Sequence, residues 1–93
     1  MLRDQNVFDM AKAIPSLPAN MIQAACTQLK LQGNAFFKKK EYARAIEAYN
    51  GALIGMPEEA AIYSNRSVCY LKEKEYDKAL SDAETCIKLM PEW

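Results

Sequence analysis

The chain has 93 residues, of which 51% are hydrophobic and 26% are charged, so it can form one small domain around an apolar core. Basic and acidic side chains number 12 each, a balance that argues against a nucleic-acid-binding protein. Histidine is absent, which removes the commonest general base and metal ligand, and we therefore expect no enzyme, no metal and no other cofactor.

Residues 1–20 are predicted to be an N-terminal extension. Asp4 can cap a short helix, after which Pro15 and Pro18 break the chain. The apolar side chains of that helix would lie on one side: Val7, Phe8, Ala11 and Ile14. No apolar run here resembles a signal peptide or a membrane span, so we expect a cytoplasmic protein without a membrane partner.

The next helix is predicted to begin near Met21 and to end near Lys39. Asn20 has the character of an N-cap residue, and Gln23 stands three positions later as its capping-box partner. The helix would be roughly 28 Å long at ~1.5 Å per residue.

A second helix is predicted after a break at residues 39–41. It should end near Met56, because Pro57 disfavours helical backbone at the residue before it. Gly55 is a plausible C-cap residue. Pro57 would then stand in the first turn of the following helix, where Glu58 suits the positive end of the helix dipole.

The same pattern returns 34 residues later, with a break at residues 73–75 and a helix end near Met90. We therefore divide the chain into a first unit over 21–59 and a second over 60–93. Small residues, Gly33 and Ala45 in the first unit, are expected to let the paired helices approach closely. The identical pairs are Lys38/Lys72, Lys40/Lys74, Glu41/Glu75, Tyr42/Tyr76, Ala45/Ala79, Met56/Met90, Pro57/Pro91 and Glu58/Glu92.

This period and a set of side chains resemble the tetratricopeptide repeat family. The first unit contributes Leu29, Lys30, Gly33, Asn34, Phe36, Ala45, Tyr49, Ala52 and Pro57; the second contributes Tyr63, Ser64, Asn65, Arg66, Ser67, Tyr70, Tyr76, Ala79, Cys86 and Pro91. The resemblance implies an all-α fold of helix-turn-helix repeats in an α–α superhelix, with two repeats after the N-terminal extension.

More narrowly, the chain resembles the carboxylate-clamp co-chaperones, such as the heat-shock organising protein. That resemblance implies binding of an acidic C-terminal peptide, Glu-Glu-Val-Asp or similar, from heat-shock chaperones of the 70- or 90-kilodalton class. The implied carboxylate-binding residues are Lys30, Asn34, Asn65 and Lys72. The remaining clamp positions of the family lie on a third repeat.

The residues themselves agree with such a ligand. Lys30 and Asn34 are four apart and share one helix face, and Asn65 occupies the corresponding helix of the next unit. We expect one ammonium and two amide groups to act as donors with no acid nearby, which suits a carboxylate. The alternative is that Lys30 is an ordinary solvated lysine.

The second unit ends at Trp93, and we expect a third repeat and a capping helix to be absent. Peptide binding should then be weakened, and the apolar face of the last helix should be uncovered. We therefore expect self-association, through a second copy on that face or through helices exchanged between copies. A self-assembling scaffold and the targeting region of a larger enzyme are the alternative functions. The apolar positions of that helix are Ala79, Leu80, Ala83, Cys86, Ile87 and Met90.

The cysteines, Cys26, Cys69 and Cys86, have neither the spacing of a zinc site nor an even number. Cys69 and Cys86 stand where the repeat needs small apolar groups, so we expect them to be buried and inert. The run of lysines at 38–40 is expected to complement a helix C-terminus and remain solvated.

Overall fold

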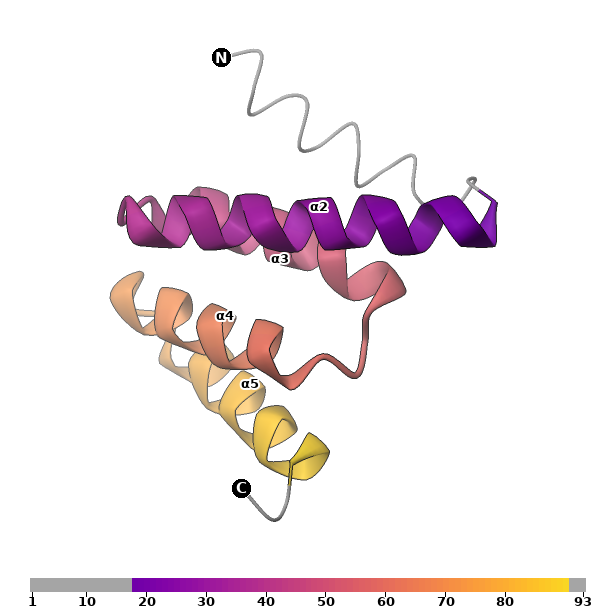
Figure 1. Ribbon diagram of the computed structural model, residues 1–93. Coiled ribbons are helices and arrows are strands. Elements are labelled where there is room, and N and C mark those ends of the chain that lie inside the picture. Colours follow the sequence, from indigo (N-terminus) through magenta and orange to yellow (C-terminus); the bar gives the residue numbers. More distant parts are fainter. Residues whose placement is uncertain (1–17, 91–93) are drawn as a thin grey trace.

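The computed structural model describes residues 18–90 as four helices, with no strand in that range (Figure 1). The helices are α2 (Ala19–Lys38), α3 (Tyr42–Gly55), α4 (Ala60–Lys72) and α5 (Tyr76–Leu89). This confirms the all-α prediction. The short helix predicted around Val7 and the end of the second unit at Trp93 fall outside the described residues.

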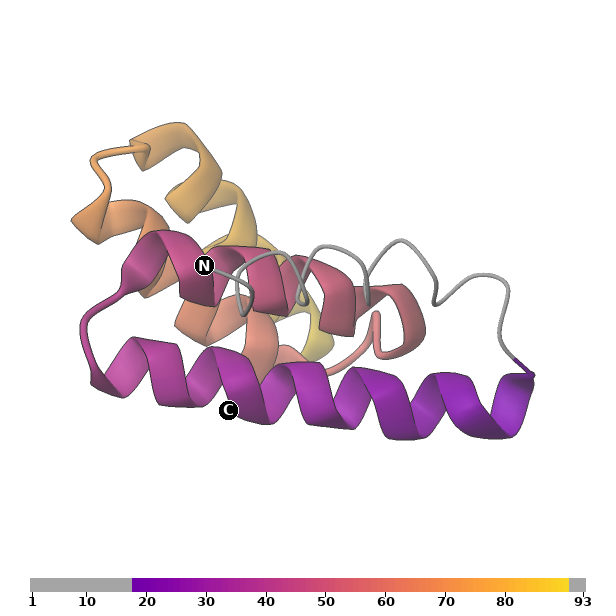
Figure 2. The same cartoon turned by 90° about the horizontal axis from the view of Figure 1, so that it is seen from above.

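The helices form two antiparallel pairs that stack on each other. α2 packs along α3 and α4 packs along α5, while α3 and α4 join the pairs (Figures 1 and 2). α2 is longer than its partner and extends past the end of α3 (Figure 2). A smaller contact between α2 and α4 brings the first helix of each pair together.

The core lies between α2, α3 and α4, because small side chains allow the axes to approach and a few large ones fill the space between them. Its buried members are Cys26, Leu29, Ala45, Ala48, Tyr49, Ala52, Ile62 and Cys69. Cys86 is also buried, at 7% exposure. The prediction of buried cysteines is therefore confirmed.

Gly33 permits the close contact between α2 and α3. A methyl group at this position would lie 2.6 Å from the nearest ring carbon of Tyr49, which is far inside van der Waals contact. Gly55 has the same role at the other end of the pair, since a methyl group there would lie 2.7 Å from the sulfur of Cys26. The predicted C-cap role of Gly55 is wrong: it is the last helical residue, and Met56 is the cap.

The two breaks inside the pairs are confirmed, and they have the same geometry. Lys40 and Lys74 both adopt φ 63°, in the left-handed region that side chains other than glycine rarely occupy. The N–H groups of Lys40 and Lys74 donate to carbonyl groups at the ends of α2 and α4. Each turn thus ends a first helix and starts its antiparallel partner.

The helix starts differ from the predicted caps. α2 begins at Ala19, and the carbonyl of Pro18 accepts hydrogen bonds from the N–H groups of Met21 and Ile22. The predicted N-cap, Asn20, therefore lies within the helix. α4 begins at Ala60, so Pro57 precedes it in a turn and is not in its first turn. Neither helix start has a side-chain cap hydrogen bond.

Candidate functional site

Two of the four predicted binding residues meet directly. Asn34 of α2 and Asn65 of α4 are joined by a hydrogen bond of 3.2 Å from Asn65 Nδ2 to Asn34 Oδ1. Lys30 lies one turn before Asn34 on α2, while Lys72 lies exposed in the last turn of α4. Within residues 18–90, no hydrogen bond or ion pair connects Lys72 to the other three.

Tyr49 of α3 fixes the two asparagines, whereas the sequence pointed to it only as a residue of the repeat pattern. Its hydroxyl donates to Asn34 Oδ1 at 2.6 Å and accepts from Asn65 Nδ2 at 3.3 Å. The ring is completely buried, and that burial raises the pKa of the Tyr49 hydroxyl, which remains a proton donor. We refer to Tyr49, Asn34 and Asn65 as the amide cluster.

The amide cluster fixes which atoms of Asn34 are available. Its Oδ1 accepts from two donors, so its NH₂ group is left without a partner among the residues that the structure describes. Asn65 instead donates inward, to Asn34 and to Tyr49. The expectation of two free amide donors is therefore wrong for Asn65, whose NH₂ group already holds the cluster together.

An acid does lie near Lys30, contrary to the expectation from the sequence. Lys30 Nζ is 3.3 Å from Glu59 Oε2, and the two side chains are 25% and 39% exposed. Glu59 precedes α4, and the stacking of α4 beside α2 brings it to Lys30 across 29 residues of sequence. Such a contact depends on how the helix pairs stack, which the spacing within one helix does not specify.

Arg66 is the centre of a second polar cluster that the sequence analysis did not find. Its guanidinium binds both carboxylate oxygens of Asp82 at 2.7 Å and donates to Asn50 Oδ1 at 2.8 Å. It also lies 5.7 Å and 5.5 Å from the ring centroids of Tyr63 and Tyr70. Hydrogen bonding to Asp82 raises the pKa of Arg66, so the guanidinium stays charged, and its bonds to Asp82 and Asn50 hold α3, α4 and α5 together.

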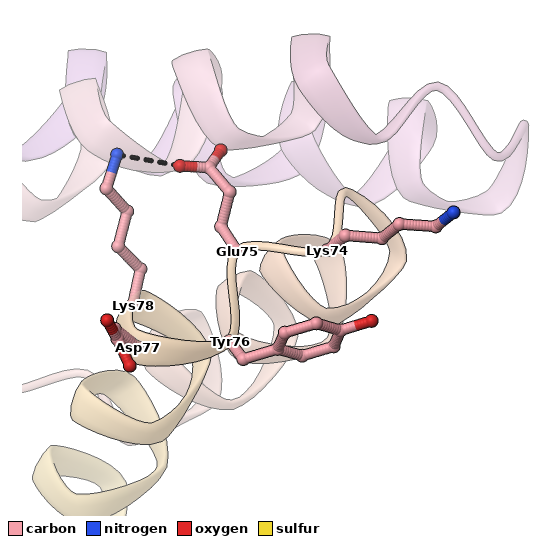
Figure 3. Close-up of a pocket in the computed structure, with 5 residues that line it drawn as sticks. All are labelled: Lys74, Glu75, Tyr76, Asp77 and Lys78. Atoms are coloured by element: carbon pink, nitrogen blue, oxygen red, sulfur yellow. Dashed lines mark ion pairs between the residues drawn. The ribbon is translucent and has the colours of Figure 1, made fainter.

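Two surface hollows lie at the turns within the helix pairs. One, of about 320 Å³, is lined by residues 74–78 at the start of α5 (Figure 3). Lys78 and Glu75 pair with each other at 2.9 Å, whereas the side chains of Lys74 and Tyr76 point away from that pair (Figure 3). Another lies at the equivalent turn of the first pair, beside Lys40. Neither hollow is lined by Lys30, Asn34 or Asn65.

An apolar stripe runs along the outer side of α5. Its large members are exposed at 60% for Tyr76 and Leu80, 65% for Ile87 and 40% for Met90. Ala79 and Cys86, which were predicted to belong to the same face, are instead buried against α4. We refer to Tyr76, Leu80, Ile87 and Met90 as the α5 stripe.

The described part of the chain contains no cluster of three or more acidic, cysteine or histidine side chains able to hold a metal ion. In the same range, no helix is both long and apolar enough to cross a membrane.

Two stacked antiparallel helix pairs with identical turns 34 residues apart are the architecture of a helical repeat. The family description "Tetratricopeptide repeat" matches residues 60–93, which include α4 and α5. The chain thus contains a tetratricopeptide repeat over residues 60–93. Its architecture is that of a protein–protein interaction module, since such repeats expose a helical face for partners.

The chain is similar to short parts of three longer proteins. It is 51% identical over 67 residues to the heat shock protein sti1 homolog of Schizosaccharomyces pombe, covering 71% of this chain and 11% of that protein. It is 47% identical over 60 residues to stress-induced-phosphoprotein 1 of Caenorhabditis elegans, covering 64% of this chain and 19% of the relative. It is 45% identical over 60 residues to the Hsp70-Hsp90 organizing protein of Triticum aestivum, covering 64% of this chain and 10% of that protein. The chain thus spans about a tenth to a fifth of the length of these relatives.

Proposed function

We propose that this repeat protein binds the acidic C-terminal peptide of a heat-shock chaperone, with the side of α2 and α4 that carries Lys30 and the amide cluster as its binding face. The observation that supports this most is the orientation of Asn34. Its oxygen is held by Tyr49 and Asn65, which leaves its NH₂ group available as a donor to a ligand. The name of the wheat relative, an Hsp70-Hsp90 organizing protein, supports chaperones as the source of the peptide.

The chemistry favours a carboxylate over a neutral group. Lys30 lies one helical turn from Asn34, so an ammonium and an amide can bind the two oxygens of one terminal carboxylate. Charge-assisted hydrogen bonds contribute about 1.5–3 kcal/mol each. Because few donors are available, we expect a dissociation constant on the order of a millimolar for a short peptide.

Titration of the chain with a labelled Glu-Glu-Val-Asp peptide tests this function. The same peptide with an amidated C-terminus is the ligand control, because it lacks the terminal carboxylate. Lys30→Ala and Asn34→Ala should each weaken binding several-fold, whereas Lys88→Ala on exposed α5 should not. Equal binding of the free and amidated peptides, or no effect of either site variant, would reject the proposal.

A second candidate is self-association through the α5 stripe, and the 40–65% exposure of its four large apolar side chains favours it. A second copy presents the same stripe, so two α5 helices can pair antiparallel about a two-fold axis. Asp77 and Lys88 flank the stripe on one side, and in that arrangement Asp77 of each copy lies near Lys88 of its partner. The charges at the ends of the pair are therefore complementary.

Sedimentation at micromolar to millimolar concentration tests self-association. We expect a reversible dimer that Ile87→Lys converts to a monomer, whereas Leu71→Lys, at a 52% exposed position on α4, should leave the dimer intact. Lys30→Ala should also leave it intact, because the peptide face is separate. A monomer over the whole concentration range would exclude this candidate.

A further inference from the structure

Glu59 is a carboxylate already bound at the predicted peptide site. Its Oε2 lies 3.3 Å from Lys30 Nζ, at the long end of hydrogen-bonding distance, and this is the one hydrogen bond that residues 18–90 provide to that ammonium. Both side chains are partly exposed, at 25% for Lys30 and 39% for Glu59. The pair is thus accessible to solvent and can be opened without disturbing the core.

The side chain of Glu59 has no evident role in starting α4. It occupies the N-cap position, but it makes no side-chain hydrogen bond to the first turn of that helix. The hydrogen bond from Ile62 N–H goes to the backbone carbonyl of Glu59, which any residue would supply. Helix capping therefore does not explain why the carboxylate extends toward α2.

We infer that Glu59 competes with the ligand, acting as an internal carboxylate that a peptide must displace from Lys30. This rests on the function proposed above and adds a residue that sets its strength. A peptide carboxylate and the Glu59 carboxylate are the same chemical group, and the tether gives Glu59 a millimolar-range effective concentration. With Glu59 in place, its carboxylate compensates the positive charge of Lys30. A ligand that makes only one weak contact with the binding face is therefore disfavoured.

The expected effect is modest, because a partly exposed ion pair contributes little. Removing the competing carboxylate should tighten peptide binding about two- to fivefold. It should also make binding more sensitive to salt, because Lys30 then carries an uncompensated charge. The gain must depend on Lys30, which separates competition at this ammonium from a general change in net charge.

The test compares Glu59→Gln with Glu58→Gln, which removes the same charge from the adjacent, exposed residue. Each variant is titrated with the free Glu-Glu-Val-Asp peptide, and thermal unfolding confirms that both remain folded. We expect a two- to fivefold gain for Glu59→Gln, a smaller change for Glu58→Gln, and no gain for Glu59→Gln in a chain that also carries Lys30→Ala.

The outcomes separate this inference from the function on which it rests. If the wild-type chain binds the peptide but Glu59→Gln binds no better than Glu58→Gln, competition by Glu59 is rejected and peptide binding stands. If the gain persists without Lys30, the effect is one of net charge and the inference is again rejected. If no variant distinguishes the free from the amidated peptide, both proposals fail.

Discussion

Tyr49 connects the packing of the molecule to its predicted binding face. Its ring lies against the backbone of Gly33, and its hydroxyl bonds to the side chain of the next residue, Asn34. The ring therefore sets the spacing between α2 and α3, while the hydroxyl sets the direction of the amide. One residue thus contributes both to the core and to the presentation of a donor.

Replacing Tyr49 with phenylalanine separates these two roles. We expect Tyr49→Phe to cost about 1 kcal/mol of stability, since Asn34 and Asn65 lose a shared partner. Peptide affinity should fall several-fold as well, because the Asn34 amide can then turn its oxygen toward the ligand. Tyr63→Phe is the control: it removes a hydrogen bond to the carbonyl of Pro57 and should leave peptide affinity unchanged. Unaltered binding by Tyr49→Phe would show that the hydroxyl does not orient the site.

Lys74 illustrates strain at a single residue. A left-handed backbone costs a side-chain-bearing residue about 1–2 kcal/mol, and glycine avoids that cost at the expense of some unfolded-state entropy. Lys74→Gly should therefore stabilise the chain by about 0.5–1 kcal/mol in urea unfolding. Glu73→Gly, at φ −88° in the same turn, should destabilise it. A loss of stability in both variants would contradict this reading of the turn.

At the scale of elements, the helices were predictable and their cross-connections were not. Apolar spacing and the 34-residue period predicted two helix pairs and the turns at Lys40 and Lys74, because both depend on local backbone preferences. The bond between Arg66 and Asp82 joins side chains 16 residues apart, and the pair of Lys30 with Glu59 spans 29. Such contacts follow from the stacking of helices, and one sequence provides no local signal for them.

The Arg66–Asp82 pair should be a major source of stability for the second helix pair. Its carboxylate is almost fully buried, with Asp82 4% exposed. Asp82→Ala should therefore cost about 2–4 kcal/mol in urea unfolding, because Arg66 remains partly buried without its counterion. Asp77→Ala, on the exposed side of α5, should cost less than about 1 kcal/mol. Equal losses in the two variants would mean that the buried pair contributes no more than a surface charge.

For the molecule as a whole, the buried thiol of Cys69 predicts sensitivity to alkaline pH. Burial, followed by the nearby charge of Glu73, raises the pKa of Cys69 from 9.0 to about 11 in the folded chain. As the pH rises, the thiol ionises in the unfolded chain before it does in the folded chain, and this favours unfolding. The free energy of unfolding is therefore unaffected by Cys69 ionisation below pH 9 and falls as the pH rises from 9 to 11. The loss is at most about 2–3 kcal/mol.

Thermal unfolding measured across that pH range tests the expectation. The wild-type melting temperature should fall steeply between pH 9 and 11. Cys69→Ala should begin lower, because it leaves a small cavity, but it should fall less steeply. The raised pKa of the buried Tyr49 hydroxyl adds to the decline in both chains, so some slope should remain. Identical slopes would show that Cys69 is not responsible.

Of the candidate site, the sequence predicted which helices carry Lys30, Asn34 and Asn65, because residues four apart share a face and equivalent helices stack. It did not reveal that Asn65 donates inward or that Glu59 faces Lys30, since both depend on helix pairs meeting at a particular angle. The sequence offered a hint for Tyr49, because a tyrosine paired with the small Gly33 can place its ring between the helices and its hydroxyl at their edge. Only the fold shows that this hydroxyl points to Asn34.

The close contact of Tyr49 with Gly33 is made in the first unit and not at the equivalent positions of the second. Thirty-four residues later, Ser67 stands at the position of Gly33 and Ala83 at the position of Tyr49. The hydroxyl of Ser67 donates to the carbonyl of Ala79. Conversely, the first unit has Gln32 at the position of Arg66 and Ala48 at the position of Asp82. The side-chain oxygen of Gln32 is buried and has no hydrogen-bond partner in the described range. The two units therefore join their helices differently, the first through the ring of Tyr49 and the second through the Arg66–Asp82 ion pair. A chain assembled from two copies of either half would keep the period but lose the amide cluster, which takes Asn34 and Tyr49 from the first unit and Asn65 from the second.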